Sequence, residues 1–122
     1  MKLVIENKKL IIDLEGWEKF FTFKFDGHFE IPLAHITSVS FAPPKTDWRE
    51  ARAPGMFVPR LIKAGTWYSP RGKEFWYVRR SRPQTVVFEL QNEKYDRLIL
   101  GFPVGDMIES TLRAHRLPVT TP

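Results

Sequence analysis

The sequence of 122 residues contains no cysteine. Without thiols the chain cannot form disulfide bonds, use a cysteine nucleophile, or hold cysteine-ligated zinc or iron–sulfur clusters. The lack of cysteine agrees with a reducing compartment, and we therefore expect a cytoplasmic protein. Apolar runs are also short: none approaches the roughly 20 residues of a membrane-spanning helix, so we expect no integral membrane segment.

Sequence signatures of catalytic and metal sites are scarce as well. The three histidines, His28, His35 and His115, do not show the HxxxH spacing of metal ligands. Gly65 and Gly72 have the wrong spacing for a phosphate-binding loop, and no hydroxyl residue follows Lys73. No Gly-x-Ser-x-Gly nucleophile elbow occurs. We therefore expect no metal, no cofactor and no enzyme activity.

Large apolar residues, in contrast, are plentiful. Hydrophobic residues make up 43% of the chain and aromatic residues 14%, which is enough for one well-packed core and unlike a disordered chain. A chain of this length is typical of a single domain. We expect one domain over residues 1–117, followed by a C-terminal tail of residues 118–122.

Alternation of apolar and polar residues predicts a mainly β domain. Residues 2–6 and 9–14 alternate and are separated by Asn7-Lys8, which suits a tight hairpin turn because Asn tolerates positive φ. Further strands are expected over residues 29–33, 36–41, 61–69, 73–80, 85–90 and 98–102. Residues 73–80 carry large apolar side chains on both faces. This pattern predicts a strand that is covered on two sides, or one whose second face meets a partner.

Two segments favour helical structure. Apolar residues recur with helical spacing over residues 104–115, with Asp106 in the expected first turn. We expect this helix to cap the open end of a strongly bent sheet. Residues 15–21 fit a short helix, although the phenylalanines of residues 21–25 alternate as they would in a strand.

Residues 42–59 are expected to form a long loop, because four prolines there would interrupt a strand ladder. The loop carries Trp48, Met56 and Phe57, large apolar residues that need a surface to pack on. Together with Trp67 they make up our candidate interaction loop. Two interpretations remain open: the loop packs on its own sheet, or it serves as a lid or an oligomer contact.

Positive charge is concentrated in the middle of the chain. Residues 45–82 contain ten Lys or Arg and three Asp or Glu, within a chain of net charge +5. Aromatic residues are interleaved with the basic ones, as in surfaces that bind phosphates, stack bases or insert at lipid headgroups. Arg80 and Arg82 would share one face of a strand and could grip one phosphate together. A solubilising face is the alternative to an anion-binding site made of Arg60, Lys63, Arg71, Lys73, Arg79, Arg80 and Arg82.

Four short motifs carry a resemblance to a known group of proteins. Residues 31–39 (IPLAHITSV), 64–67 (AGTW), 72–76 (GKEFW) and 95–100 (YDRLIL) resemble uncharacterised prokaryotic proteins with a pleckstrin-homology-like fold. The resemblance implies an α+β domain that is mainly β. About seven antiparallel strands would form two near-orthogonal sheets, a barrel closed at one end by a C-terminal helix.

The superfold implied by this resemblance serves many kinds of binding, including lipid headgroups, peptides and proteins, so it does not select one function. Members that bind phosphoinositides use basic residues of the first hairpin. Here that hairpin contains Lys2, Lys8 and Lys9 but lacks the arginine that ends the Lys-x(n)-Lys/Arg-x-Arg pattern of those members.

Three functional hypotheses follow. The first is a non-catalytic binding or scaffolding module that takes a protein partner or associates with itself. The second is a binder of anionic surfaces, either membrane headgroups or nucleic acid, through residues 60–82. The third is an unrecognised enzyme, which would require a concave pocket that holds titratable residues with perturbed pKa values.

Overall fold

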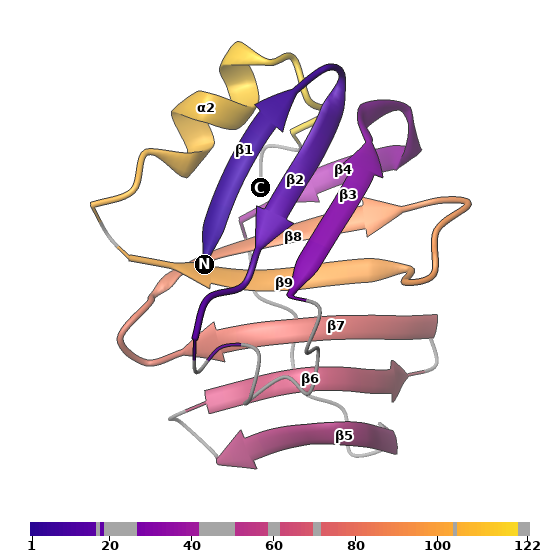
Figure 1. The fold of residues 1–122 in the computed structure, drawn as a ribbon, viewed down its shortest axis with the longest axis vertical. Coiled ribbons are helices and arrows are strands. Elements are labelled where there is room, and N and C mark those ends of the chain that lie inside the picture. The colour runs from indigo at the N-terminus through magenta and orange to yellow at the C-terminus, as the bar shows by residue number, and fades with distance from the viewer. Residues whose placement is uncertain are drawn as a thin grey trace.

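Two β-sheets and a C-terminal helix make up the domain (Figure 1). The computed structural model describes residues 1–16, 18, 27–41, 51–58, 62–69, 72–103 and 105–119. The expected mainly β, α+β class is confirmed. The helix and strand suggested for residues 15–25 lie largely outside the described residues, and so does Trp48.

The smaller sheet contains three antiparallel strands in sequence order. They are β1 (Lys2–Glu6), β2 (Lys9–Asp13) and β3 (His28–Pro32). Asn7 and Lys8 join β1 to β2, and both have positive φ, 51° and 59°. Two consecutive positive φ angles are those of a type I′ turn, whose twist matches that of the flanking strands. The predicted opening hairpin is therefore confirmed.

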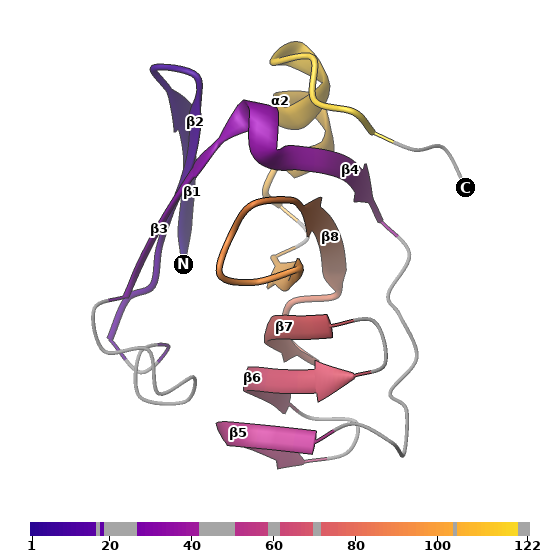
Figure 2. The ribbon, with the colours of Figure 1, turned by 90° about the vertical axis from the view of Figure 1, so that its right-hand side faces the viewer.

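The larger sheet contains six strands in the order β4-β8-β9-β7-β6-β5. Their bounds are β4 (Ile36–Ser40), β5 (Ala51–Val58), β6 (Ile62–Ser69), β7 (Gly72–Arg79), β8 (Gln84–Leu90) and β9 (Arg97–Phe102). A 3-10 turn, η1 (Leu33–His35), leads from β3 to β4. Except for β5, each strand lies within one residue of a predicted one. Figure 2 shows the two sheets facing each other, and in Figure 1 the strands of the smaller sheet cross those of the larger one steeply.

The sheets differ in two respects from the arrangement that the resemblance implies. The described residues form nine strands instead of about seven, and the two sheets do not close into a barrel. In addition, β7 and β9 pair in parallel, with Trp76 opposite Ile99. The expectation of purely antiparallel sheets is therefore wrong for this pair. The reason is that β9 lies between β7 and β8 in the sheet. The consecutive strands β7 and β8 run in opposite directions, and β9 pairs antiparallel with β8, so β9 runs parallel to β7.

The turn that joins β7 to β8 has to pass over the end of β9, and Gly101 makes room for it. A Cβ atom on Gly101 would lie 2.8 Å from the carbonyl oxygen of Arg82 in that turn and 3.3 Å from a methyl group of Val78. A backbone oxygen cannot move aside as a flexible side chain can. The residue at this position must therefore lack a side chain.

Strand β5 occupies a segment that the sequence predicts to be a loop. It pairs with β6 and forms the edge of the larger sheet, so the loop prediction is wrong for residues 51–58. The register shifts between Arg52 and Gly55, a stretch that includes Pro54. Proline is tolerated on an edge strand and at such irregularities, because the missing N–H removes no essential ladder bond.

The main core fills the space between the two sheets and the helix α2 (Ile108–Ala114). Inward residues of β2, β3 and β6–β9 pack with Ile108 and Leu112 of α2. The helix starts later than predicted, because the N–H of Asp106 bonds the carbonyl of Pro103 in a preceding turn. In the part of the chain that the structure describes, no helix has the length and apolar character to cross a membrane.

The segment after the helix remains attached to the domain as far as Val119. The carbonyl of Pro118 accepts a hydrogen bond of 2.9 Å from the N–H of Val39, and Val119 forms a bridge with Val39. Leu117 is buried in the main core. The first two residues of the predicted tail therefore contact β4.

We expect Gly101→Ala to lower the free energy of unfolding by about 1–3 kcal/mol, the usual range for forcing extra volume into a packed site. Gly105→Ala is the matched control, because a Cβ atom there meets nothing within 4 Å. Both substitutions reduce the freedom of the unfolded chain equally, so their difference isolates the clash with Arg82. Urea denaturation of both variants measures it, and equal effects would contradict the steric account.

Candidate functional site

The predicted anion-binding residues that the structure describes do not gather on one surface. Arg60 and Arg71 lie outside the described residues. Lys63 stands opposite Val78, and Tyr68 stands opposite Lys73, in the β6–β7 ladder. Residues directly opposite one another share a face, and faces alternate along a strand. Lys63 therefore lies on the outer face of the larger sheet and Lys73 on the inner one.

The outer face of the larger sheet is buried and contains two of the predicted residues, Lys63 and Trp67. Trp67, Trp76, Val87 and Ile99 form a second apolar cluster there. Lys63 is 5% exposed, and its Nζ lies 3.7 Å from the centre of the Trp76 ring. A cation over an aromatic face is attracted by the ring quadrupole. The two-sided burial predicted for β7 is confirmed, and Trp67 lies in β6.

A buried ion pair lies on the same outer face. Glu74, which is 1% exposed, stands opposite Arg97 across the parallel β7–β9 pair. The Nη2 of Arg97 lies 2.6 Å from Oε2 of Glu74, and the Nε1 of Trp76 donates a hydrogen bond of 3.0 Å to Oε1 of Glu74. A buried carboxylate is tolerated only when it is paired and hydrogen-bonded in this way. The pair links β7 to β9, and local sequence patterns give no sign of it.

The turn after β7 gathers three predicted arginines. Because β7 ends at Arg79, the expectation that Arg80 and Arg82 share a strand face is wrong. The chain turns back instead, and the N–H of Arg82 bonds the carbonyl of Arg79 at 2.9 Å. Arg80 is exposed, whereas Arg82 forms an ion pair of 3.0 Å with the largely buried Glu18. At this turn the guanidinium group of Arg82 therefore has a structural partner, whereas that of Arg80 is accessible to solvent.

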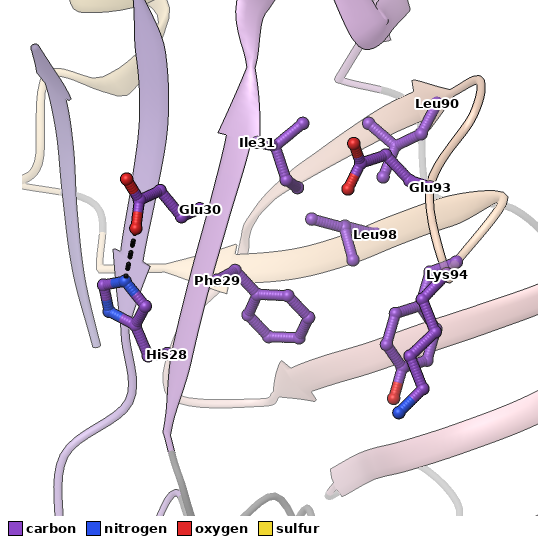
Figure 3. Close-up of a pocket in the computed structure, with 9 residues that line it drawn as sticks. His28, Phe29, Glu30, Ile31, Leu90, Glu93, Lys94 and Leu98 are labelled. Atoms are coloured by element: carbon purple, nitrogen blue, oxygen red, sulfur yellow. Dashed lines mark hydrogen bonds and ion pairs between the residues drawn. The ribbon is translucent and has the colours of Figure 1, made fainter. Parts of the chain in front are cut away.

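A cleft opens between β3 and the turn of residues 91–96, which joins β8 to β9 (Figure 3). Its volume is about 120 Å³. The apolar part of the lining consists of Phe29, Ile31, Leu90 and Leu98. The sequence did not reveal this cleft, because β3 and the turn are about 60 residues apart in the chain and only the fold brings them together.

Aromatic contacts hold one end of the cleft. Tyr95 meets Phe29 and Phe75 edge-on, with ring centroids 5.8 Å and 5.7 Å apart. The Tyr95 hydroxyl also lies 3.1 Å from the hydroxyl of Thr66. Such edge contacts are favourable beyond the area that they bury. The wall of the cleft at Tyr95 is therefore fixed by three different strands.

The two ends of the cleft carry opposite charges. Oε2 of Glu93 lies 2.5 Å from Nδ1 of His35, which places this carboxylate beside η1. In Figure 3 the Glu93 carboxylate lies near Ile31 and Leu90, whereas Lys94 lies away from them, toward the other end of the cleft. The Nζ of Lys94 is 6.0 Å from the centre of the Tyr95 ring.

A charged network covers the outer face of the smaller sheet, on the far side of β3 from the cleft. The Nδ1 of His28 lies 2.7 Å from Oδ1 of Asp13, and its Nε2 lies 3.3 Å from Oε2 of Glu30. Lys9 donates to Oε1 of Glu30 at 3.0 Å. Within the described residues, no group of three or more such side chains is placed to hold a metal ion. The network is one of ion pairs.

These contacts move two pKa values in opposite directions. Hydrogen bonds to Asp13 and then to Glu30 raise the pKa of His28 above 6.5. Hydrogen bonds from Lys9 and then from His28 lower the pKa of Glu30 below 4.5. The stabilisation from His28 is complete below pH 6.5 and disappears as the pH rises through its raised pKa. The stabilisation from Glu30 is present above pH 4.5 and disappears as the pH falls through its lowered pKa.

We expect His28→Gln to destabilise the domain most between about pH 5 and 6.5, and hardly at all well above the raised pKa of His28. Urea denaturation of wild type and variant at pH 5.5 and pH 9 gives the two differences. The control is the same substitution in an Asp13→Asn, Glu30→Gln background, where its pH dependence should vanish. An effect of equal size at both pH values would show that the ion pairs do not stabilise the fold.

Comparisons with known proteins do not assign the chain to a family. No family model matches it, and neither a curated protein nor a solved structure does. The resemblance to pleckstrin-homology-like proteins therefore stays a prediction from four short motifs.

Proposed function

We propose that this domain is a non-catalytic binding module that takes an extended segment of a partner protein in the cleft between β3 and the turn of residues 91–96. The observation that carries the proposal is the recessed apolar lining around a volume of about 120 Å³. An apolar cavity of roughly 150 Å³ lined by similar side chains holds a benzene molecule. The cleft thus has room for one apolar side chain, and is smaller than the ~300–1,000 Å³ of typical small-molecule sites.

The place of β3 in its sheet favours an extended ligand. In the described part of the chain, β3 is the last strand of the three-stranded sheet, and the cleft runs beside it. Partner segments commonly add to such edge strands, where backbone hydrogen bonds give affinity and side-chain pockets give specificity. Phe29 and Ile31 of β3 supply the pocket side of this arrangement.

We also propose that the fold is a variant of the pleckstrin-homology-like superfold. Two facing sheets with crossing strands and a C-terminal helix at one end support this assignment. The parallel β7–β9 pair is a departure from it. The proposed binding site does not depend on the assignment, because function is decided by the site and not by the fold.

Titration with N-acetyl-leucinamide, followed by two-dimensional NMR, tests the cleft. We expect amide shifts at residues 29–31 and 90–98, and their loss in Leu90→Trp, which fills the cleft. Leu90→Phe is the milder alternative if that variant does not fold. The matched control is Glu89→Trp, which adds the same ring one residue away at an exposed position and should leave binding unchanged. Shifts elsewhere, or shifts that survive in Leu90→Trp, would contradict the proposal.

Sedimentation at increasing protein concentration addresses self-association. If wild type forms dimers and Leu90→Trp does not, the segment in the cleft comes from a second copy. If both remain monomeric while the titration succeeds, the partner is a different protein.

Binding of an anionic surface is the second candidate function. The observation in its favour is that the turn after β7 contains three arginines within four residues, of which Arg80 is exposed. Phosphate groups of lipids or nucleic acids are suitable partners for guanidinium groups. Glu18 neutralises part of this charge through Arg82, so Arg80 would be the main contact.

We expect Arg80→Glu to weaken co-sedimentation with anionic vesicles at low salt, with no binding to neutral vesicles. Arg116→Glu is the control, since it makes the same charge change at an exposed position after α2. Raising the salt to 0.5 M should release the wild type, because exposed charges are screened within a few ångströms. Equal binding by both variants, or binding that resists salt, would exclude this turn as the contact. A parallel titration with single-stranded DNA distinguishes nucleic acid from lipid.

A further inference from the structure

We infer that the cleft recognises an order of charges: its protein partner carries a basic side chain on one side of the apolar anchor residue and an acidic side chain on the other. This inference rests on the proposed function of the cleft and adds the chemistry of the partner segment. It follows from the opposite charges at the two ends of the cleft, and from the contacts that hold them there.

The acidic end is fixed by Glu93. Its carboxylate contacts the ring of His35 in η1, and its side chain is 21% exposed. Figure 3 shows this carboxylate beside Ile31 and Leu90. A carboxylate that is half-buried and oriented by a neighbour loses little freedom when it binds a cation. A basic side chain of the partner would therefore be placed at this end.

The basic end is formed around Tyr95. The Nζ atoms of Lys94 and Lys73 lie 6.0 Å and 4.9 Å from the centre of its ring. The ring itself is held by Phe29, Phe75 and Thr66. Two ammonium groups near one ring make this end favourable for a carboxylate.

The other charged residues beside the cleft do not cancel this polarity. Along β3, side chains alternate between the two faces, so Phe29 and Ile31 face the cleft while His28 and Glu30 face away. Both oxygens of Glu30 are engaged, one by Lys9 and one by His28. Of the residues that line the cleft, Glu93 and Lys94 therefore carry the charges that a ligand meets, and Lys73 adds to the basic end.

Two peptides with the same composition test the inference. They are acetyl-Lys-Thr-Leu-Thr-Glu-amide and acetyl-Glu-Thr-Leu-Thr-Lys-amide. In an extended chain, residues two positions from the leucine point to the same side as the leucine, so both charges face the cleft. The peptides differ only in charge order. Their apolar anchor, net charge and length are identical.

We expect NMR titrations to show one peptide bound about two- to thirtyfold more tightly than the other, since the two exposed pairs contribute roughly 0.2–1 kcal/mol each. A nitroxide on the lysine end of the preferred peptide should broaden the amide signals of Ile31 and Leu90 most. In 1 M salt the preference should fall towards unity.

The decisive variant exchanges the two charges of the cleft, Glu93→Lys with Lys94→Glu, and should invert the preference. Because it also removes the contact with His35, Lys94→Glu alone serves as a second variant. That substitution sets a carboxylate beside Lys73, so the basic end loses its net positive charge and the preference should fall, while the contact with His35 remains. Thermal denaturation confirms that each variant is folded.

The outcomes separate the inference from the function on which it rests. If both peptides bind the cleft with equal affinity, or if the exchange leaves the preference unchanged, the charge-order inference is wrong and the binding module stands. If neither peptide nor N-acetyl-leucinamide shifts the cleft residues, the proposed function itself is wrong.

Discussion

The insertion of β9 between β7 and β8 is the constraint on which the other features of the domain depend. It makes β7 and β9 parallel neighbours, in a register that sets Glu74 opposite Arg97. The buried carboxylate therefore has a guanidinium partner, and the outer face of the sheet can be buried without an uncompensated charge. The same insertion requires Gly101, because the turn after β7 crosses the end of β9.

This arrangement also holds the candidate site in place. The backbone N–H of Asp96 donates a hydrogen bond of 2.7 Å to the carbonyl of Lys73. The carboxylate of Asp96 in turn accepts a hydrogen bond of 2.8 Å from the backbone N–H of Lys73. The turn of residues 91–96 is thereby tied to the start of β7. Glu93 and Lys94 project from that turn, so the charges at the cleft have a rigid support. Binding sites whose contacting side chains are held in place lose less entropy when they take a ligand.

Sequence patterns were reliable where the physical cause of the structure is local. Sequence patterns located eight strands, and Asn7-Lys8 marked the type I′ turn, because period and backbone freedom belong to neighbouring residues. The pattern failed at β5, where prolines such as Pro54 indicated a loop. An edge strand tolerates these residues only because β6 supplies a partner on one side, and no local pattern records that partner.

The sequence by itself determined the mainly β class, the extent of most strands, the C-terminal helix and the two apolar faces of β7, since each follows from periodicity within one segment. Only the tertiary structure decided the strand order, the parallel β7–β9 pair and the partners of the basic residues. The cleft belongs to the second group. Its walls come from β3 and from the turn of residues 91–96, and their contact depends on how the two sheets pack.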